Sequence, residues 1–343
     1  MLKICLALVA FSIVLAGCGE TAKVDEQTAL KTDLKVGLVF DTGGRGDKSF
    51  NDSAYAGLDK ASKEMGFKPD TIDSKDAKDY EANLSAMADR NCKIVFAVGI
   101  SMKNAVEAIA PKYPNIKFAI IDASVMAPNV RSLLFKEEEG SFLVGYLAGL
   151  TTKTNKIGFV GGMKIPLIKK FEAGFFAGAK TANFNVQTLD SKYTGSWSDT
   201  TLGKVSADVL FGDGADIVFH ASGLCGMGVI SSAKEHNKFA IGVDSDQDGV
   251  AEGNVLTSMI KRVDTAVYQT ILDVKNDKFT AGDMFFDLKT DGVGLSEMRF
   301  TKDKVPGDAM AKVEEMKKKI ISGAVKVPTS DEELAAYLST LTK

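Results

Sequence analysis

The sequence predicts an α/β protein built from two doubly wound lobes, and three observations support this fold class. Short apolar segments alternate with segments of helical periodicity along most of the chain, which is typical of parallel sheets with right-handed crossovers. The alternation starts twice, at "KVGLVFDTGG" from Lys35 and at "KIGFVGG" from Lys156. The length of 343 residues suits two domains. A ligand cleft is expected between the lobes, beyond the carboxyl ends of their strands.

The expected elements follow in chain order. Strands are predicted at 35–40, 93–98, 117–122, 156–162, 216–221 and 239–244. Helices are predicted at 50–66, 79–90, 102–110, 166–183, 198–211 and 225–237, and 136–155 reads as a helix and connector. After Asp244 we expect a helix within 261–277, a β-rich segment at 285–301 and a charged helix within 307–323, followed by a terminal segment with a helical pattern.

The first residues have the features of a secretory signal. Lys3 precedes an apolar run from Ile4 to Ala16 that is too short to span a bilayer as a stable helix. "LAGC" resembles the lipobox of bacterial lipoproteins, which predicts a signal peptide at 1–17 and a lipidated Cys18 as the new N-terminus. The alternative is a signal without lipidation. Residues 18–33 comprise this cysteine and a polar segment that we interpret as a flexible tether.

Composition argues against several classes of protein. Removing residues 1–17 takes away Lys3 and changes the net charge from −3 to −4, and an acidic chain without a basic cluster argues against nucleic-acid binding. Cys92 and Cys225 form no CxxC spacing, which favours buried free thiols over a disulfide. With His220 and His236 as the only histidines, a histidine-based metal site is not expected.

The turn after the first strand, "DTGGRGDKSFN", fits none of the familiar glycine-rich motifs. Asp47 separates Gly46 from Lys48, which breaks the phosphate-loop pattern, and the dinucleotide fingerprint lacks its third glycine. The Arg45-Gly46-Asp47 tripeptide is short enough to occur by chance. What remains is Asp41 at the strand end, with Phe50 and Asn51 at the helix start. These residues suit a neutral ligand with a ring and hydroxyls. The alternative is a structural role, with Phe50 as a core residue of the helix and Asp41 as a turn cap.

Two further acids end predicted strands. Asp122 follows "FAII", and Asp244 begins "DSDQDG", which matches the opening of an EF-hand loop. Position twelve of that loop would be Val255 instead of the required glutamate, so calcium is not expected. We interpret the acids at strand ends as acceptors for ligand hydroxyls or amines.

The second half contributes aromatic and glycine candidates. Trp197 lies in the polar loop "YTGSWSD", a good position for stacking on a ligand, and Phe171 lies on the helix "IPLIKKFEAGFFAG", where ordinary packing is the alternative. Gly223 would allow close approach of a ligand to the backbone or would cap a turn. No motif pairs a nucleophile with a base, so catalysis has no positive support.

Together these segments, with "GADIVF", "IGVDSDQ" and "LTSMIKRVD", resemble the basic membrane protein family of bacterial lipoproteins, also called the purine nucleoside receptor family. The resemblance runs from about residue 35 to 294. It implies a type I periplasmic-binding-protein fold and capture of a purine nucleoside (guanosine, adenosine or inosine) for an ABC permease. The implied protein is no enzyme, needs no cofactor, and is a monomer attached to the cell envelope by its lipid anchor.

The resemblance also implies roles for individual residues. Phe50 and Trp197 would stack on the base from opposite lobes, while Asn51 and Asp122 would read its polar edges. The remaining positions would contact ribose, backbone or cleft wall: Asp41, Phe171, Gly223, Asp244 and Lys261. The turn "FHASGLCGMG" departs from the family pattern, and Trp197 stands where phenylalanine is common.

Two lobes joined by hinge crossovers are expected. Lobe one would comprise 34–136 and about 244–282, and lobe two 137–243 and about 283–343. The rival functions are a sugar receptor of the same fold, a surface adhesin that binds a host macromolecule, and, less well supported, a nucleoside-cleaving enzyme.

Overall fold

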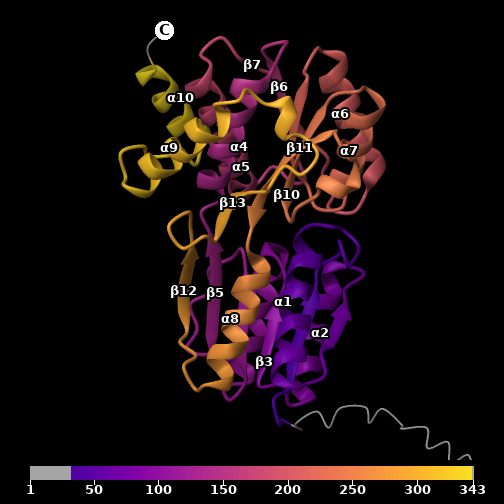
Figure 1. Cartoon of the computed structure of the whole chain (residues 1–343). Coiled ribbons are helices and arrows are strands. Elements are labelled where there is room, and N and C mark those ends of the chain that lie inside the picture. The colour runs from indigo at the N-terminus through magenta and orange to yellow at the C-terminus, as the bar shows by residue number, and fades with distance from the viewer. Residues whose placement is uncertain (1–31, 342–343) are drawn as a thin grey trace, which may run out of the picture.

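The computed structural model describes residues 32–341, and these form two lobes, each built on one twisted sheet (Figure 1). The predicted signal, Cys18 and nearly all of the tether lie outside the described residues. No helix within 32–341 is long and apolar enough to cross a membrane.

The first sheet has six parallel strands in the order β12-β5-β4-β3-β1-β2. The strands are β1 (Val36–Phe40), β2 (Asp70–Asp73), β3 (Ile94–Ala97), β4 (Lys117–Ile121), β5 (Val130–Phe135) and β12 (Gly282–Phe286). Its helices are α1 (Phe50–Met65), α2 (Tyr80–Asp89), α3 (Lys103–Ile109) and α8 (Val263–Lys275). Apolar cores lie on both faces of this sheet, which explains why β1 and β3 are apolar throughout.

The second sheet follows the order β13-β11-β10-β9-β6-β7, with β8 also paired to β6. The strands are β6 (Lys156–Gly161), β7 (Gln187–Thr188), β8 (Lys192–Tyr193), β9 (Ile217–Ala221), β10 (Phe239–Asp244), β11 (Val255–Lys261) and β13 (Val293–Leu295). All pairings are parallel except that of β13 with β11. The helices are α4 (Glu137–Thr151), α5 (Pro166–Ala182), α6 (Thr200–Gly212), α7 (Cys225–Glu235), α9 (Ala309–Ile321) and α10 (Asp331–Thr340).

Helices α4 and α5 pack closely because glycines face backbone across their interface. A Cβ at Gly145 would lie 2.0 Å from the carbonyl oxygen of Phe175, and one at Gly178 would lie 2.0 Å from that of Phe142. The helix that begins lobe two is therefore held tightly against the rest of that lobe. Figure 1 shows α9 and α10 on the outer side of the same helix pair.

The chain passes between the sheets after β5, after β11 and between β12 and β13. Strand β11 belongs to the second sheet and β12 to the first, whereas the predicted division assigned 244–282 to lobe one and 283–343 to lobe two. The sequence does not show which sheet β11 and β12 join, because sheet membership depends on the strands with which each one pairs. The predicted β-rich segment, 285–301, contains the end of β12 in the first sheet and all of β13 in the second.

Every predicted strand and helix has a counterpart in the structure, with ends that differ by a few residues. The strands that were not predicted are polar or carry a buried charge. Strand β2 is a polar edge strand, and β5 contains the buried Arg131, whose guanidinium lies 2.7 Å from Asp273 and donates to the Thr280 carbonyl. A strand that buries an arginine does not show an apolar pattern.

Candidate functional site

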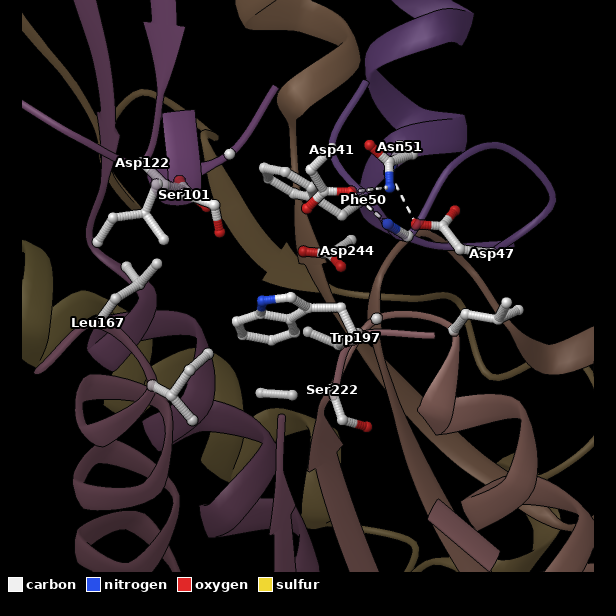
Figure 2. A pocket seen from close by; sticks show the side chains of 18 of the residues that line it. Asp41, Asp47, Phe50, Asn51, Ser101, Asp122, Leu167, Trp197, Ser222 and Asp244 are labelled. Atoms are coloured by element: carbon white, nitrogen blue, oxygen red, sulfur yellow. Dashed lines mark hydrogen bonds between the residues drawn. The ribbon is translucent and has the colours of Figure 1, made fainter. Parts of the chain in front are cut away.

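A cavity lies between the lobes, at the carboxyl ends of β1, β3 and β4 from the first sheet and of β9, β10 and β11 from the second (Figure 2). All nine predicted ligand residues line it: Asp41, Phe50, Asn51, Asp122, Phe171, Trp197, Gly223, Asp244 and Lys261. The structure therefore brings these side chains together, and their contact with a ligand stays a prediction. Phe50 comes from the first lobe and Trp197 from the second, and Figure 2 shows both rings at the cavity.

Asp47 organises the turn that leads into α1. Its Oδ1 accepts hydrogen bonds from the backbone N–H groups of Ser49 (2.9 Å) and Asp52 (3.1 Å), and its Oδ2 accepts from that of Asn51 (2.8 Å). Such a carboxylate satisfies the free N–H groups at a helix start. Asp47 is only 1% exposed and the Arg45 guanidinium lies over the Tyr55 ring, so the Arg-Gly-Asp tripeptide does not present its acid to a partner.

Asp41 and Asn51 form a pair on the first lobe's side of the cavity. Asp41 Oδ1 accepts hydrogen bonds from Asn51 Nδ2 (3.0 Å) and from the Gly43 N–H (2.9 Å), as Figure 2 shows for the two labelled side chains. Burial raises the pKa of Asp41, and these hydrogen bonds oppose that rise. Asn51 Oδ1 is buried and has no hydrogen-bond partner among the described residues.

Lys261 is the only basic residue that lines the cavity in the described chain, and it is already paired. Its Nζ lies 2.7 Å from both carboxylate oxygens of Asp122 and 3.2 Å from Glu137 Oε1. Burial would lower the pKa of Lys261, but these acids outweigh it and the net direction is upward. The ammonium also lies 5.2 Å from the ring centre of Phe50 and 5.6 Å from that of Phe171, within cation–π range.

Asp244 joins the lobes at the cavity wall. Its Oδ2 accepts a hydrogen bond from Ser49 Oγ, which also lies 3.3 Å from the Val243 carbonyl oxygen. Burial raises the pKa of Asp244 to about 7, against the attraction of Lys261. Asp122 and Asp244 both have left-handed backbone, with φ of 70° and 63°, a conformation that is uncommon outside glycine and often found at functional sites.

A buried network lies behind the wall of the second lobe. Gln247 Oε1 accepts from the Val243 N–H (3.0 Å) and lies 3.0 Å from His220 Nε2, while Gln247 Nε2 donates to the Lys48 carbonyl of the other lobe (3.2 Å). Burial lowers the pKa of His220 to about 4, so the imidazole is neutral. Because Gln247 Oε1 is an acceptor, His220 Nε2 carries the proton.

The unusual residues of the turn after β9 have mainly packing roles. A Cβ at Gly226 would lie 2.0 Å from the His220 ring, so this glycine is needed beside the imidazole. Gly223 has φ of 57°, and a Cβ there would lie 3.1 Å from the Trp197 carbonyl oxygen. Cys225 and Cys92 are buried free thiols, as predicted.

Comparison with known proteins decides the family. Residues 34–331 match the family model described as "ABC transporter substrate-binding protein PnrA-like". The chain belongs to this family. It is therefore an ABC transporter substrate-binding protein, and the predicted family and fold class are confirmed.

Individual relatives cover nearly the whole chain of this family member. A CD4+ T-cell-stimulating antigen of Listeria monocytogenes is 38% identical, over 94% of this chain and 96% of the relative. The ABC transporter nucleoside-binding protein BmpA of Lactococcus lactis is 37% identical, over 92% and 95%. A solved ABC transporter solute-binding protein from Aeropyrum pernix K1 superposes with a TM-score of 0.82 at 31% identity, covering 89% of this chain and 98% of that one.

Several cavity residues of this substrate-binding protein were not predicted from the sequence. They are Gly43, Asp47, Gly99, Ile100, Ser101, Leu167, Ile168, Ala221, Ser222, Leu224 and Val243. Gly99, Ile100 and Ser101 lie two to four residues after the end of β3, so the rule that ligands bind beyond the carboxyl ends of parallel strands could have found them. Leu167 and Ile168 begin α5, and nothing in their pattern separates them from core residues.

Proposed function

We propose that this protein captures a purine nucleoside in the interlobe cavity and delivers it to an ABC permease. The observation that carries the proposal is the pair of aromatic residues, Phe50 and Trp197, that line one cavity from opposite lobes. Stacking of a base on an aromatic side chain is worth roughly 1–3 kcal/mol. The Lactococcus lactis relative, which is named a nucleoside-binding protein, supports the same ligand class.

The charges of the cavity favour a nucleoside over a nucleotide. Four aspartates line it, and the one basic lining residue of the described chain, Lys261, is neutralised by Asp122 and Glu137. A phosphate would add negative charge where no free cation receives it. Ribose hydroxyls, by contrast, can donate hydrogen bonds to carboxylates such as that of Asp244.

The transport role extends to the anchor and to the motion of the lobes. Lipidation at Cys18 would attach the protein to the cell envelope, where it would act as a monomer. Ligand capture would close the lobes about their crossings and form the surface that the permease binds. Equal small-angle scattering with and without saturating ligand would contradict closure.

The test is calorimetry on residues 19–343, after denaturation and refolding to remove any carried-over ligand. The panel is adenosine, guanosine, inosine, uridine, ribose and AMP, and circular dichroism checks the refolded protein. Sub-micromolar binding of a purine nucleoside with little binding of AMP is expected. Binding of ribose alone would favour a sugar receptor, and no binding by folded protein would overturn the proposal. Chromatography of the nucleoside mixtures would reveal any free base formed by cleavage.

A further inference from the structure

The contact between Asp41 and Asn51 determines the orientation of the Asn51 side-chain amide, with Nδ2 toward Asp41. The carboxylate oxygen Oδ1 of Asp41 lies 3.0 Å from Asn51 Nδ2 and also accepts the Gly43 N–H at 2.9 Å. A carboxylate oxygen in such a position can only accept, so the amide nitrogen of Asn51 must face it. The reversed amide would place two acceptors 3.0 Å apart inside a buried site, which is strongly unfavourable.

This orientation leaves the Asn51 carbonyl oxygen without a donor. Asn51 lines the cavity, its Oδ1 is buried, and no described residue donates to it. The backbone of Asn51 is itself held by Asp47, which accepts its N–H at 2.8 Å. A buried acceptor without a partner is costly, and a bound ligand is the natural source of the missing donor.

The second polar side chain expected to read the base is also an acceptor. Both carboxylate oxygens of Asp122 lie 2.7 Å from Lys261 Nζ, so this carboxylate is paired with a cation and offers only acceptor capacity to a ligand. The first lobe thus presents acceptors from both Asn51 and Asp122. Its complement is a ring edge that carries N–H groups.

We propose that Asp41 is a positioning residue that fixes the polarity of Asn51, so that the cavity selects purine nucleosides whose base edge carries an N–H donor. This inference rests on the proposed nucleoside function and goes further, since it assigns Asp41 to the amide of Asn51 and not to the ribose. The Asp41–Asn51 contact also requires glycine at position 43, because a Cβ there would lie 3.0 Å from Asp41 Oδ1 and 3.1 Å from Asn51 Nδ2.

The test compares two ligands with the same sugar. Inosine carries an N–H at ring position 1, whereas purine riboside has only acceptors on its base edge. Wild-type protein should bind inosine roughly tenfold or more tightly than purine riboside, because purine riboside would leave the buried Asn51 acceptor unpaired. In Asp41→Leu the Asn51 amide is free to turn its NH₂ toward purine riboside, so the ratio of the two dissociation constants should fall toward one.

Two further variants separate geometry from charge. Asp41→Asn removes the charge but keeps an oxygen that can accept from both Asn51 and Gly43, so it should keep the wild-type ratio even if both affinities change. Gly43→Ala keeps the carboxylate but crowds the pair, so it should lower the ratio, and it serves if Asp41→Leu does not fold. The loss caused by replacing inosine with 2′-deoxyinosine should be the same in all variants.

Each outcome has a defined meaning. Equal binding of the two ligands by the wild type would overturn this inference alone, and so would an unchanged ratio in both Asp41→Leu and Gly43→Ala. A ratio lost in Asp41→Asn would show that the charge matters and not the amide orientation. Absence of binding by folded wild type would overturn the proposed function together with this inference.

Discussion

Lys261 Nζ lies 2.7 Å from each carboxylate oxygen of Asp122, although the two residues belong to different sheets. Asp122 follows β4 in the first sheet and Lys261 ends β11 in the second, immediately before the chain crosses back to the first lobe. The pair is buried, with Lys261 only 1% exposed. It connects the lobes at one of their crossings and neutralises the charge of Asp122 in the cavity wall.

Replacing Lys261 by methionine should destabilise the protein by about 3–5 kcal/mol, because Asp122 and Glu137 would be left buried without their cation. Urea unfolding without ligand measures the change. Lys103→Met is the matched control, since Lys103 pairs with Glu107 on an exposed helix face and should cost less than about 1 kcal/mol. Equal effects of the two substitutions would show that the buried pair does not stabilise the fold.

Asp244 should make the ligand-free protein less stable as pH rises. Burial raises its pKa to about 7, whereas an unfolded aspartate has a pKa near 3.9. Between these values the folded carboxyl binds a proton that the unfolded one releases, so the stabilisation is present below about pH 4 and is lost as pH rises to 7. Asp244→Asn should reduce the fall in unfolding free energy between pH 5 and pH 8 by about 1 kcal/mol or more.

The control for this pH effect is Asp303→Asn. Asp303 is exposed and Lys304 lowers its pKa, so it titrates below pH 5 and its replacement should leave the fall in unfolding free energy between pH 5 and pH 8 unchanged. Chemical unfolding of the three proteins at both pH values gives the comparison. A wild type that gains stability from pH 5 to pH 8, with Asp244→Asn gaining equally, would contradict the prediction.

Loss of either stacking ring should weaken nucleoside binding by about 1–3 kcal/mol, which is about 5- to 150-fold in dissociation constant. The variants are Phe50→Ala and Trp197→Ala, measured by calorimetry. Phe300→Ala is the matched control, because this ring is 38% exposed and does not line the cavity. Trp197 is the only tryptophan of the chain, so its fluorescence offers an independent binding signal in Phe50→Ala. Unchanged affinity in both variants would exclude stacking.

Ser49 should stabilise the closed arrangement of the lobes. Its hydroxyl contacts Asp244 and the Val243 carbonyl oxygen across the interface, and its own carbonyl accepts from Ser245 Oγ at 3.3 Å. Ser49→Ala should weaken nucleoside binding by about 1 kcal/mol or more and reduce the compaction seen by small-angle scattering on ligand addition. Ser62→Ala removes a hydroxyl that donates a hydrogen bond to the Asp59 carbonyl within the first lobe. It should leave the nucleoside affinity and the compaction unchanged. Identical behaviour of the two variants would contradict the role of Ser49.

Local patterns were sufficient to predict most of the fold. The apolar strands β1, β3, β4, β6, β9 and β10 could be read directly, because strands buried on both faces are continuously apolar. Position along the chain also located Asp41, Asp122 and Asp244, since each stands at or next to the carboxyl end of a strand, the edge of a parallel sheet where ligands bind. The resemblance of the motifs to a known family added the partners and the proposed ligand class.

The amino-acid sequence contains the alternation of strands and helices, the acids at the strand ends and the aromatic residues in the loops, because these depend on short-range periodicity. Which sheet receives β11 and β12 depends on long-range pairing, which periodicity does not encode. The same holds for Lys261, whose ammonium pairs with Asp122 from 139 residues away. Asp47 and Asp41 lie only four and ten residues from Asn51, to which both are hydrogen-bonded, but these contacts depend on the folded turn and not on periodicity. Such partners are fixed only when the chain folds, because each buried donor or acceptor must then be satisfied.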